Sequence, residues 1–235
     1  MSAPVFPFPP GTRPGVLLRR EKRFLVEVEL GGERLWAHTN NSGSMLGLVR
    51  RGTEALLSPA ANPKRRLPYT LEAVAAGGGW CSVNTLAPNR LLAWAFAQGL
   101  LPELAGATAI RPEARSGESR LDARFETPDG PLWVECKNVT LAEDGAALFP
   151  DARTERGRKH LEELMRLCAQ GARVATFYLV TRADAACFGP AWCVDEDYAR
   201  AFYAALDAGV EAWPWLARVD EAGIRLTRRL AVVAP

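Results

Sequence analysis

The chain has 235 residues and a net charge of +2, a length sufficient for one large domain or two small ones with their own cores. It contains no apolar tract long enough to span a bilayer, and its Pro-rich beginning lacks the regions of a signal peptide, so we expect a cytoplasmic protein without membrane contact. Its five cysteines form no Cys-x-x-Cys pair, which excludes a zinc knuckle or a disulfide framework and predicts buried thiols.

The first third of the chain is predicted to form a small barrel, because it consists of short strands separated by glycine turns. Strands are expected over residues 15–20, 24–30, 34–38 and 69–75, with short apolar stretches at 45–49 and 55–58. Trp36 and Tyr69 either stack on the bases of a nucleic-acid strand or belong to the core. The glycines 77–79 look like a hinge, so we predict domains over residues 1–80 and 81–235.

A helix is predicted over residues 84–99, where Leu91, Leu92 and Phe96 recur at helical spacing. Pro88 suits its first turn and Gly99 suits its end. A connector over 100–109 and a segment over 110–115 then lead to the central hairpin.

The hairpin over residues 119–141 holds the residues with the clearest chemistry. Two alternating strands flank a Pro-Asp-Gly turn at 128–130. On the second strand Glu135 and Lys137 point to one face, whereas Cys136 points to the other, apolar face. Asp122 on the first strand reaches the neighbourhood of Glu135, and two clustered carboxylates suit Mg²⁺, with Mn²⁺ as an alternative.

The last third of the chain is predicted to be an α/β arrangement. We expect a loop over 142–150, a helix capped by Asp151 or Thr154 and ending near Ala169, and a doubly covered strand over 173–181. A helix over 197–207, a short strand over 210–213 and a final edge strand over 223–233 follow.

Asp122 followed by Glu135-x-Lys137 resembles the signature of the PD-(D/E)xK nucleases, in which the carboxylates hold Mg²⁺ for phosphodiester hydrolysis. More of the chain resembles the sugar fermentation stimulation protein A (SfsA) family. The similar blocks lie in family order at residues 22–25, 41–45, 64–66, 83–86, 89–91, 119–122, 135–141, 149–152, 154–157 and 159–161. Cys136 departs from the β-branched residue usual in that motif, and Thr39-Asn40 departs from a Pro-Asn pair.

The resemblance implies an α+β protein, an N-terminal OB-like barrel followed by a restriction-endonuclease-like PD-(D/E)xK α/β domain, with nucleic acid as ligand. It implies Asp122, Glu135 and Lys137 as catalytic residues, the two carboxylates as metal ligands, and Glu113 as an assisting acid. It also favours ligand contacts for Asn84 and Asn89, whose other interpretation is helix capping.

Three clusters of basic residues accompany these motifs, at 19–23, 64–66 and 153–159. Each is either a solvated face or a set of phosphate contacts. The predicted nucleic-acid contacts are Arg19, Arg23, Lys64, Arg65, Arg66, Arg120, Arg156 and Lys159. Arg120 has the alternative of pairing with Glu118 or Glu126, and Lys159 that of pairing with Glu155.

The sequence therefore predicts a Mg²⁺-dependent nuclease acting on DNA or RNA, and leaves a homodimer open. One alternative is a non-catalytic DNA-binding regulator of sugar (maltose) metabolism genes. Another is a sugar-metabolising enzyme, which has no use for the basic clusters and for which no Gly-rich phosphate loop is present.

Overall fold

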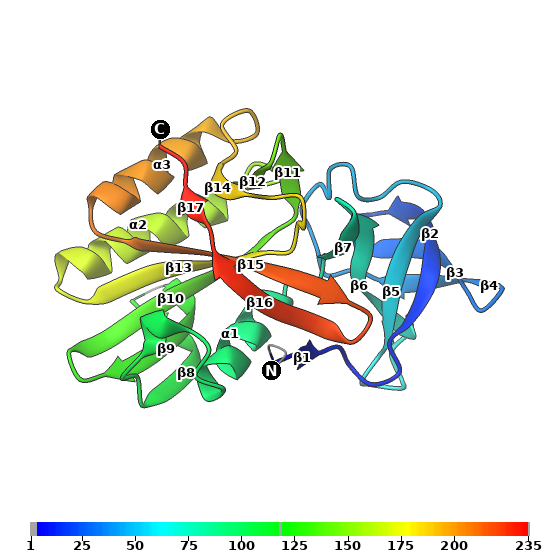
Figure 1. Ribbon diagram of the computed structural model, residues 1–235, viewed down its shortest axis with the longest axis horizontal. Coiled ribbons are helices and arrows are strands. Elements are labelled where there is room, and N and C mark those ends of the chain that lie inside the picture. Colours follow the sequence, from blue (N-terminus) through cyan, green and yellow to red (C-terminus); the bar gives the residue numbers. More distant parts are fainter. Residues whose placement is uncertain (1–3, 118, 235) are drawn as a thin grey trace.

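A computed structural model describes residues 4–117 and 119–234 as a barrel beside a larger α/β domain (Figure 1). Glu118, one of the partners considered for Arg120, lies outside the described residues. Among the described helices, none is long and apolar enough to cross a membrane.

The barrel is built from a six-stranded sheet whose neighbouring strands are antiparallel and whose closing pair is parallel. Its strand order is β4 (Glu33–His38), β3 (Leu25–Leu30), β2 (Arg13–Glu21), β5 (Thr53–Pro59), β6 (Tyr69–Ala76) and β7 (Gly79–Ser82). A further pairing of His38 with Thr70 joins β4 to β6 and closes five of the strands. Alternate residues such as Leu17, Val26 and Leu71 fill its interior without exposure, because successive side chains of a strand point to opposite faces. The predicted barrel is confirmed.

The expected hinge at residues 77–79 is wrong. Gly77 and Gly78 have φ of 61° and 76° and form the turn of a hairpin, because β7 continues the barrel sheet by pairing with β6. The division at residue 80 stays a prediction.

The second domain is built on a seven-stranded mixed sheet. Its order is β1 (Phe6–Pro7), β16 (Gly223–Arg229), β15 (Glu211–Asp220), β13 (Arg173–Val180), β10 (Gly130–Val139), β9 (Ser119–Thr127) and β8 (Ala109–Ser116). The central strands β10, β13 and β15 run parallel, and the outer strands are antiparallel to their neighbours. Because β1 covers β16, the expected edge strand over 223–233 is an inner strand that stops at Arg229.

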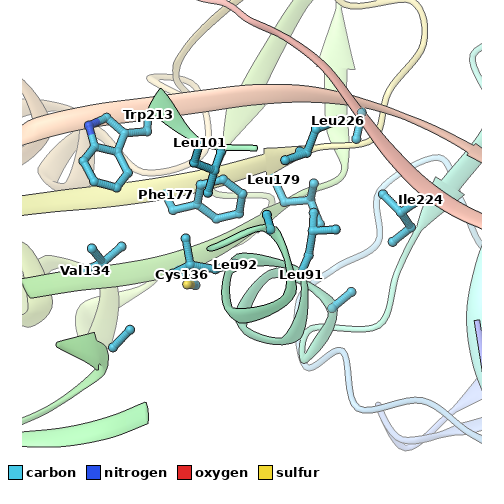
Figure 2. Packing of buried hydrophobic residues seen from close by; sticks show 14 of the residues in the cluster. Leu91, Leu92, Leu101, Val134, Cys136, Phe177, Leu179, Trp213, Ile224 and Leu226 are labelled. Carbon is cyan, nitrogen blue, oxygen red and sulfur yellow. The ribbon is translucent and has the colours of Figure 1, made fainter. Parts of the chain in front are cut away.

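Helices cover both faces of this sheet (Figure 1). Helix α1 (Ala87–Ala97) packs one face through Leu91, Leu92 and Ala95, and a short 3₁₀ turn, η1 (Pro102–Leu104), follows it. Figure 2 shows Leu91 and Leu92 against Phe177 and Leu179 of β13. Helices α2 (Glu155–Ala169) and α3 (Glu196–Asp207) pack the other face. Strand β13 lies between these helix layers and is apolar on both faces, as expected of a buried parallel strand.

The loop expected over 142–150 is instead part of a small third sheet. Strands β11 (Leu141–Glu143) and β12 (Ala146–Phe149) form a hairpin, and β14 (Cys187–Pro190) and β17 (Ala231–Val232) extend it. The strand expected over 210–213 also runs further, to Asp220. All five cysteines are free thiols, but only Cys81 and Cys136 are buried and Cys193 is exposed, so the expectation of buried thiols holds only in part.

Candidate active site

A cleft of about 600 Å³ lies where the barrel meets the second domain. Loop residues 41–43 of the barrel form one wall, and the ends of β9 and β10, the start of α1 and the start of α2 form the others. Asp122, Glu135 and Lys137 all line it, so the structure brings the three predicted catalytic residues together.

Asp122 lies where the pairing of β9 and β10 stops. The recorded ladder runs from Gly130 opposite Thr127 to Val134 opposite Ala123. Beyond this ladder, the backbone N–H of Cys136 on β10 donates to Oδ2 of Asp122 at 2.8 Å. The Asp122 carboxylate thus accepts the hydrogen bond that a backbone carbonyl of β9 would accept in a continued ladder. Asn89 of α1 donates its Nδ2 to Oδ1 at 2.6 Å. The carboxylate is therefore held from two elements in one orientation.

Glu135 is the most deeply buried member of the site, with 3% of its surface exposed. Its Oε1 accepts a hydrogen bond from Lys137 Nζ at 2.7 Å and contacts Nδ1 of His160 on α2. Lys137 Nζ also lies 3.4 Å from that histidine nitrogen. Because Cys136 and Val134 pack on the opposite, apolar face, the predicted alternation of this strand is confirmed.

The pKa values of the two carboxyl groups move in opposite directions. Burial and the charge of Glu135 raise the pKa of Asp122, although the Cys136 N–H, Lys137 and Asn89 oppose the shift. Burial alone would raise the pKa of Glu135 as well, but Lys137 and His160 outweigh it and lower that pKa to about 2. Glu135 thus stays ionised beside a carboxyl group that is harder to ionise, and a cation between them would stabilise both charges.

Two buried oxygens in the cleft have no hydrogen-bond partner within the part of the chain that the structure describes. They are Oε2 of Glu135 and Oδ1 of Asn138. An unpartnered buried carboxylate oxygen is costly, and a hard cation such as Mg²⁺ satisfies it. The described residues contain no cluster of three or more His, Cys, Asp or Glu side chains that could form a complete metal cage. The site therefore fits an ion such as Mg²⁺, which keeps several waters and binds through one or two carboxylates.

Glu113 lies at the rim of the cleft. Its side chain is 65% exposed, and its carboxylate pairs with Arg120 at 3.4 Å. Its φ of 51° interrupts the regular geometry of β8. Among the described residues Arg120 thus pairs with Glu113, and Glu126 pairs instead with Arg111 and Arg124.

The other predicted nucleic-acid contacts are divided between several surfaces. Arg23, Arg120 and Arg156 line the cleft, whereas Lys159 is exposed and pairs with Glu155 at 2.7 Å. Arg65 and Arg66 line a separate groove on the barrel, and Lys64 is exposed next to them. Arg19 is bound by Glu21 and Glu27 and lies 5.2 Å from the centre of the Trp36 ring.

Two further residues contact the carboxylates. Asn89 was expected either to contact the ligand or to cap its helix, and His160 was not among the predicted site residues. Asn89 binds Asp122 and does not cap α1, whose N-cap position is Leu86. His160 contacts Glu135 from the second turn of α2. Both lie within motif blocks of the sequence, but their contacts cross between elements 25 or more residues apart and leave no local pattern.

Asp151 connects the barrel to the second domain through two hydrogen bonds. The Asp151 carboxylate accepts the backbone N–H of Met45 at 2.8 Å, and its backbone oxygen accepts the Ser44 hydroxyl. A Cβ at Gly43 would come within 2.4 Å of Asp151, so the close approach requires glycine. Asn40 adds a second link, because its side chain binds both Asn84 and the Thr85 N–H.

The fold and the site define a two-domain protein, a closed barrel followed by an α/β domain with a carboxylate cleft at the boundary. Residues 18–83 match the family described as SfsA N-terminal OB domain, and residues 86–223 match the sugar fermentation stimulation protein RE domain. The chain belongs to the SfsA family.

Relatives of this family match the whole chain. A sugar fermentation stimulation protein homolog from Maridesulfovibrio salexigens is 54% identical, with 100% of this chain and 99% of the relative covered. A homolog from Syntrophobacter fumaroxidans is 56% identical over 96% of this chain and 87% of its own length. The structure of Pyrococcus furiosus SfsA in complex with Ca²⁺ superposes with a TM-score of 0.92, 27% identity and 100% of both chains covered. The predicted family and fold class are confirmed.

Proposed function

We propose that this chain is a Mg²⁺-dependent nuclease that hydrolyses phosphodiester bonds of DNA or RNA in the cleft. The observation that carries the proposal is the buried Oε2 of Glu135, which has no hydrogen-bond partner among the described residues and lies in a cleft that Asp122 also lines. The relative from Pyrococcus furiosus is described with Ca²⁺, which prefers the same hard oxygen ligands as Mg²⁺. Mn²⁺ is the expected substitute metal.

In this proposal Asp122 and Glu135 hold the metal. When bound, Mg²⁺ supplies Lewis-acid polarisation of the phosphoryl oxygen and makes water easier to deprotonate. Asn89 and the Cys136 N–H fix the Asp122 carboxylate so that it need not reorient when the metal binds.

Lys137 has the role of orienting the attacking water. Its ammonium is held by Glu135 at 2.7 Å, and 11% of its side chain is exposed. A hydrogen-bond donor fixed in this way holds a water at a constant position relative to the phosphate. His160 keeps the Glu135 carboxylate in place from the other side.

In this proposal the arginines of the cleft bind the phosphate. Arg120 and Arg156 line the cleft and are exposed, so a phosphate can reach both. Guanidinium groups bind phosphate oxygens in pairs and neutralise the charge that develops during hydrolysis. Lys159 does not line the cleft, pairs with Glu155 and is assigned no role in the reaction.

The test is incubation of the purified protein with labelled single- and double-stranded DNA and RNA, in Mg²⁺ or in EDTA. We expect cutting in Mg²⁺ alone, lost in Asp122→Ala. Asp129→Ala is the matched control, because Asp129 is exposed at the other end of the same hairpin. Binding without cutting, unchanged in Asp122→Ala, would instead identify a non-catalytic DNA-binding regulator of sugar genes.

A second variant tests the division of labour. Lys137→Ala should abolish cleavage with little loss of nucleic-acid binding, because the ammonium acts on water. Equal loss of cleavage and binding would contradict that role.

A further inference from the structure

A second groove, of about 820 Å³, lies on the barrel away from the carboxylates. We call it the barrel groove and define it by Lys22, Trp36, His38, Arg65 and Arg66. Arg65 is fixed by the Leu67 carbonyl at 2.6 Å and the Thr70 hydroxyl at 2.9 Å, and Arg66 is exposed. The groove therefore combines cationic groups with aromatic rings.

Trp36 and His38 line the barrel groove and are half-buried, and Phe24 adds an exposed ring next to His38, outside the lining of the groove. Phe24 is 46% exposed, and it stacks on His38 with ring centroids 6.4 Å apart and planes 29° apart. Burial and the charge of Arg65 lower the pKa of His38. An exposed ring that is already stacked on one side offers its other side to a nucleobase.

The acid that lines the barrel groove does not cancel its positive charge. Glu21 lines the groove together with Lys22, Arg65 and Arg66, so the positive charges of this lining outnumber its carboxylate. Glu21 also pairs at 2.5 Å with Arg19, which Glu27 shares. Lys22, Arg65 and Arg66 are left to attract phosphate.

A shallow depression of about 400 Å³ joins the barrel groove to the cleft. It shares Glu21 and Lys22 with the barrel groove, and it shares Arg23, Ser42, Gly43 and Ala152 with the cleft. Lys22 and Arg23 form the turn between β2 and β3, with φ of 48° and 63°. This tight turn places two basic residues between the two hollows.

The two hollows are held in a constant relative position. The floor of the depression is the loop over residues 42–44, which Asp151 fastens to the second domain. Arg20 holds the same loop from the barrel side, because its guanidinium donates to the carbonyl oxygens of Asn41, Gly43 and Ser44. A ligand that lies across the depression therefore meets one rigid surface.

We propose that the barrel groove, the depression and the cleft form one continuous track for a single strand of DNA or RNA. The bases stack on the aromatic rings of the barrel, and the same strand continues over Lys22 and Arg23 to Asp122 and Glu135. A single strand is favoured over a duplex because a duplex hides the faces of its bases. This inference rests on the proposed nuclease function, and it specifies the substrate and how the chain seats it.

The test is binding of 5′-fluorescein oligo(dT) and oligo(U), with lengths from about 4 to about 20 nucleotides, in EDTA so that no strand is cut. Anisotropy gives the affinity, and titration at high concentration gives the number of strands per chain. Phe24→Ala and Arg66→Ala remove exposed side chains of the barrel, and Arg156→Ala removes an exposed side chain of the cleft, so none of them opens the core. Arg218→Ala is the matched control, because Arg218 is exposed on β15 outside the track.

We expect the affinity to rise with length up to a plateau and the longest strand to bind once per chain. Phe24→Ala should weaken the longest strand roughly tenfold, the usual effect of losing one stacked base. Arg66→Ala and Arg156→Ala should each lower the salt dependence of binding by about 0.7 in log–log slope. Arg218→Ala should bind like the unaltered chain.

Two long strands per chain, or unchanged affinity for the longest strand in Phe24→Ala, would overturn the track. Failure of the unaltered chain to bind any single strand would also overturn it. A parallel incubation with duplex DNA in Mg²⁺ distinguishes failure of the track from failure of the proposed nuclease function. If the chain cuts duplex DNA but binds no single strand, the nuclease function stands and the track is rejected.

Discussion

Replacing Lys137 by methionine removes the ammonium that holds the buried charge of Glu135. The two groups lie 2.7 Å apart, and their side chains are 11% and 3% exposed. Methionine keeps most of the volume of lysine, so the change removes charge with little change in packing. The variant therefore isolates the electrostatic contribution of the pair.

The expected loss of folding stability depends on the Glu135 charge, which remains buried without its ammonium partner. Breaking a buried ion pair by removing one partner costs about 3–5 kcal/mol. Because His160 still contacts the same carboxylate oxygen, we expect the lower end, about 3 kcal/mol. For a chain of this length each kcal/mol lowers Tm by about 2–4 °C, so Lys137→Met should melt about 6–12 °C lower.

Thermal and urea unfolding of four proteins measure this effect: the unaltered chain, Lys137→Met, Glu135→Gln and the double variant. The double variant removes both charges of the pair, so neither position leaves an unpaired buried charge, and it should recover at least half of the loss of Lys137→Met. A Tm of Lys137→Met within 2 °C of the unaltered chain, or additive losses in the double variant, would refute the described pairing.

Three other predictions concern groups that support the site or the stability of the fold. Asn89→Ala removes the donor to Oδ1 of Asp122, and it should weaken Mg²⁺ binding by about 10–100-fold in a calorimetric titration. Asp151→Ala leaves the Met45 N–H without its acceptor, and it should cost about 1.5–3 kcal/mol in urea unfolding. The hydrogen bond from Arg166 lowers the pKa of Glu163 below its ordinary value of 4.5. The ionised Glu163 therefore stabilises the folded chain above pH 4.5, and this stabilisation is lost as the pH falls through the lowered pKa. Glu163→Gln should accordingly melt below the unaltered chain at pH 7, and the gap should close as the pH falls below 4.5.

Local patterns in the sequence predicted the elements that carry the proposed catalytic residues. The Pro-Asp-Gly turn and the alternation around Cys136 placed Glu135 and Lys137 on one face of β10, and the structure agrees. Thr154 caps α2 as one of the two expected candidates, because its hydroxyl accepts the Gly157 N–H. These features depend on residues close together in the chain.

Features that depend on distant contacts escaped prediction. The hairpin of β11 and β12 lies where a loop was expected. Its strands are only three and four residues long, and β12 pairs with β14, about 40 residues later, so the local sequence did not indicate it. Arg120 pairs with Glu113 across the β8–β9 hairpin, which neither alternative had named.

The same limit applies within α2. Arg156 and His160 lie one turn apart and hydrogen-bond to each other at 3.3 Å beside the cleft. Lys159 is adjacent in sequence but turned about 100° around the helix, where it meets Glu155. The basic cluster was visible in the sequence, but the orientation of its members was not.

The central claim is that a divalent ion held by Asp122 and Glu135 enables strand hydrolysis. The most direct measurement is the single-turnover cleavage rate across Mg²⁺ concentrations, for the unaltered chain and for Glu135→Gln, with oligonucleotide binding measured in parallel. We expect a rate that saturates with Mg²⁺ in the unaltered chain and stays at the EDTA level in Glu135→Gln, which still binds the oligonucleotide. Equal rates in the two proteins, or cleavage that persists in EDTA, would contradict it.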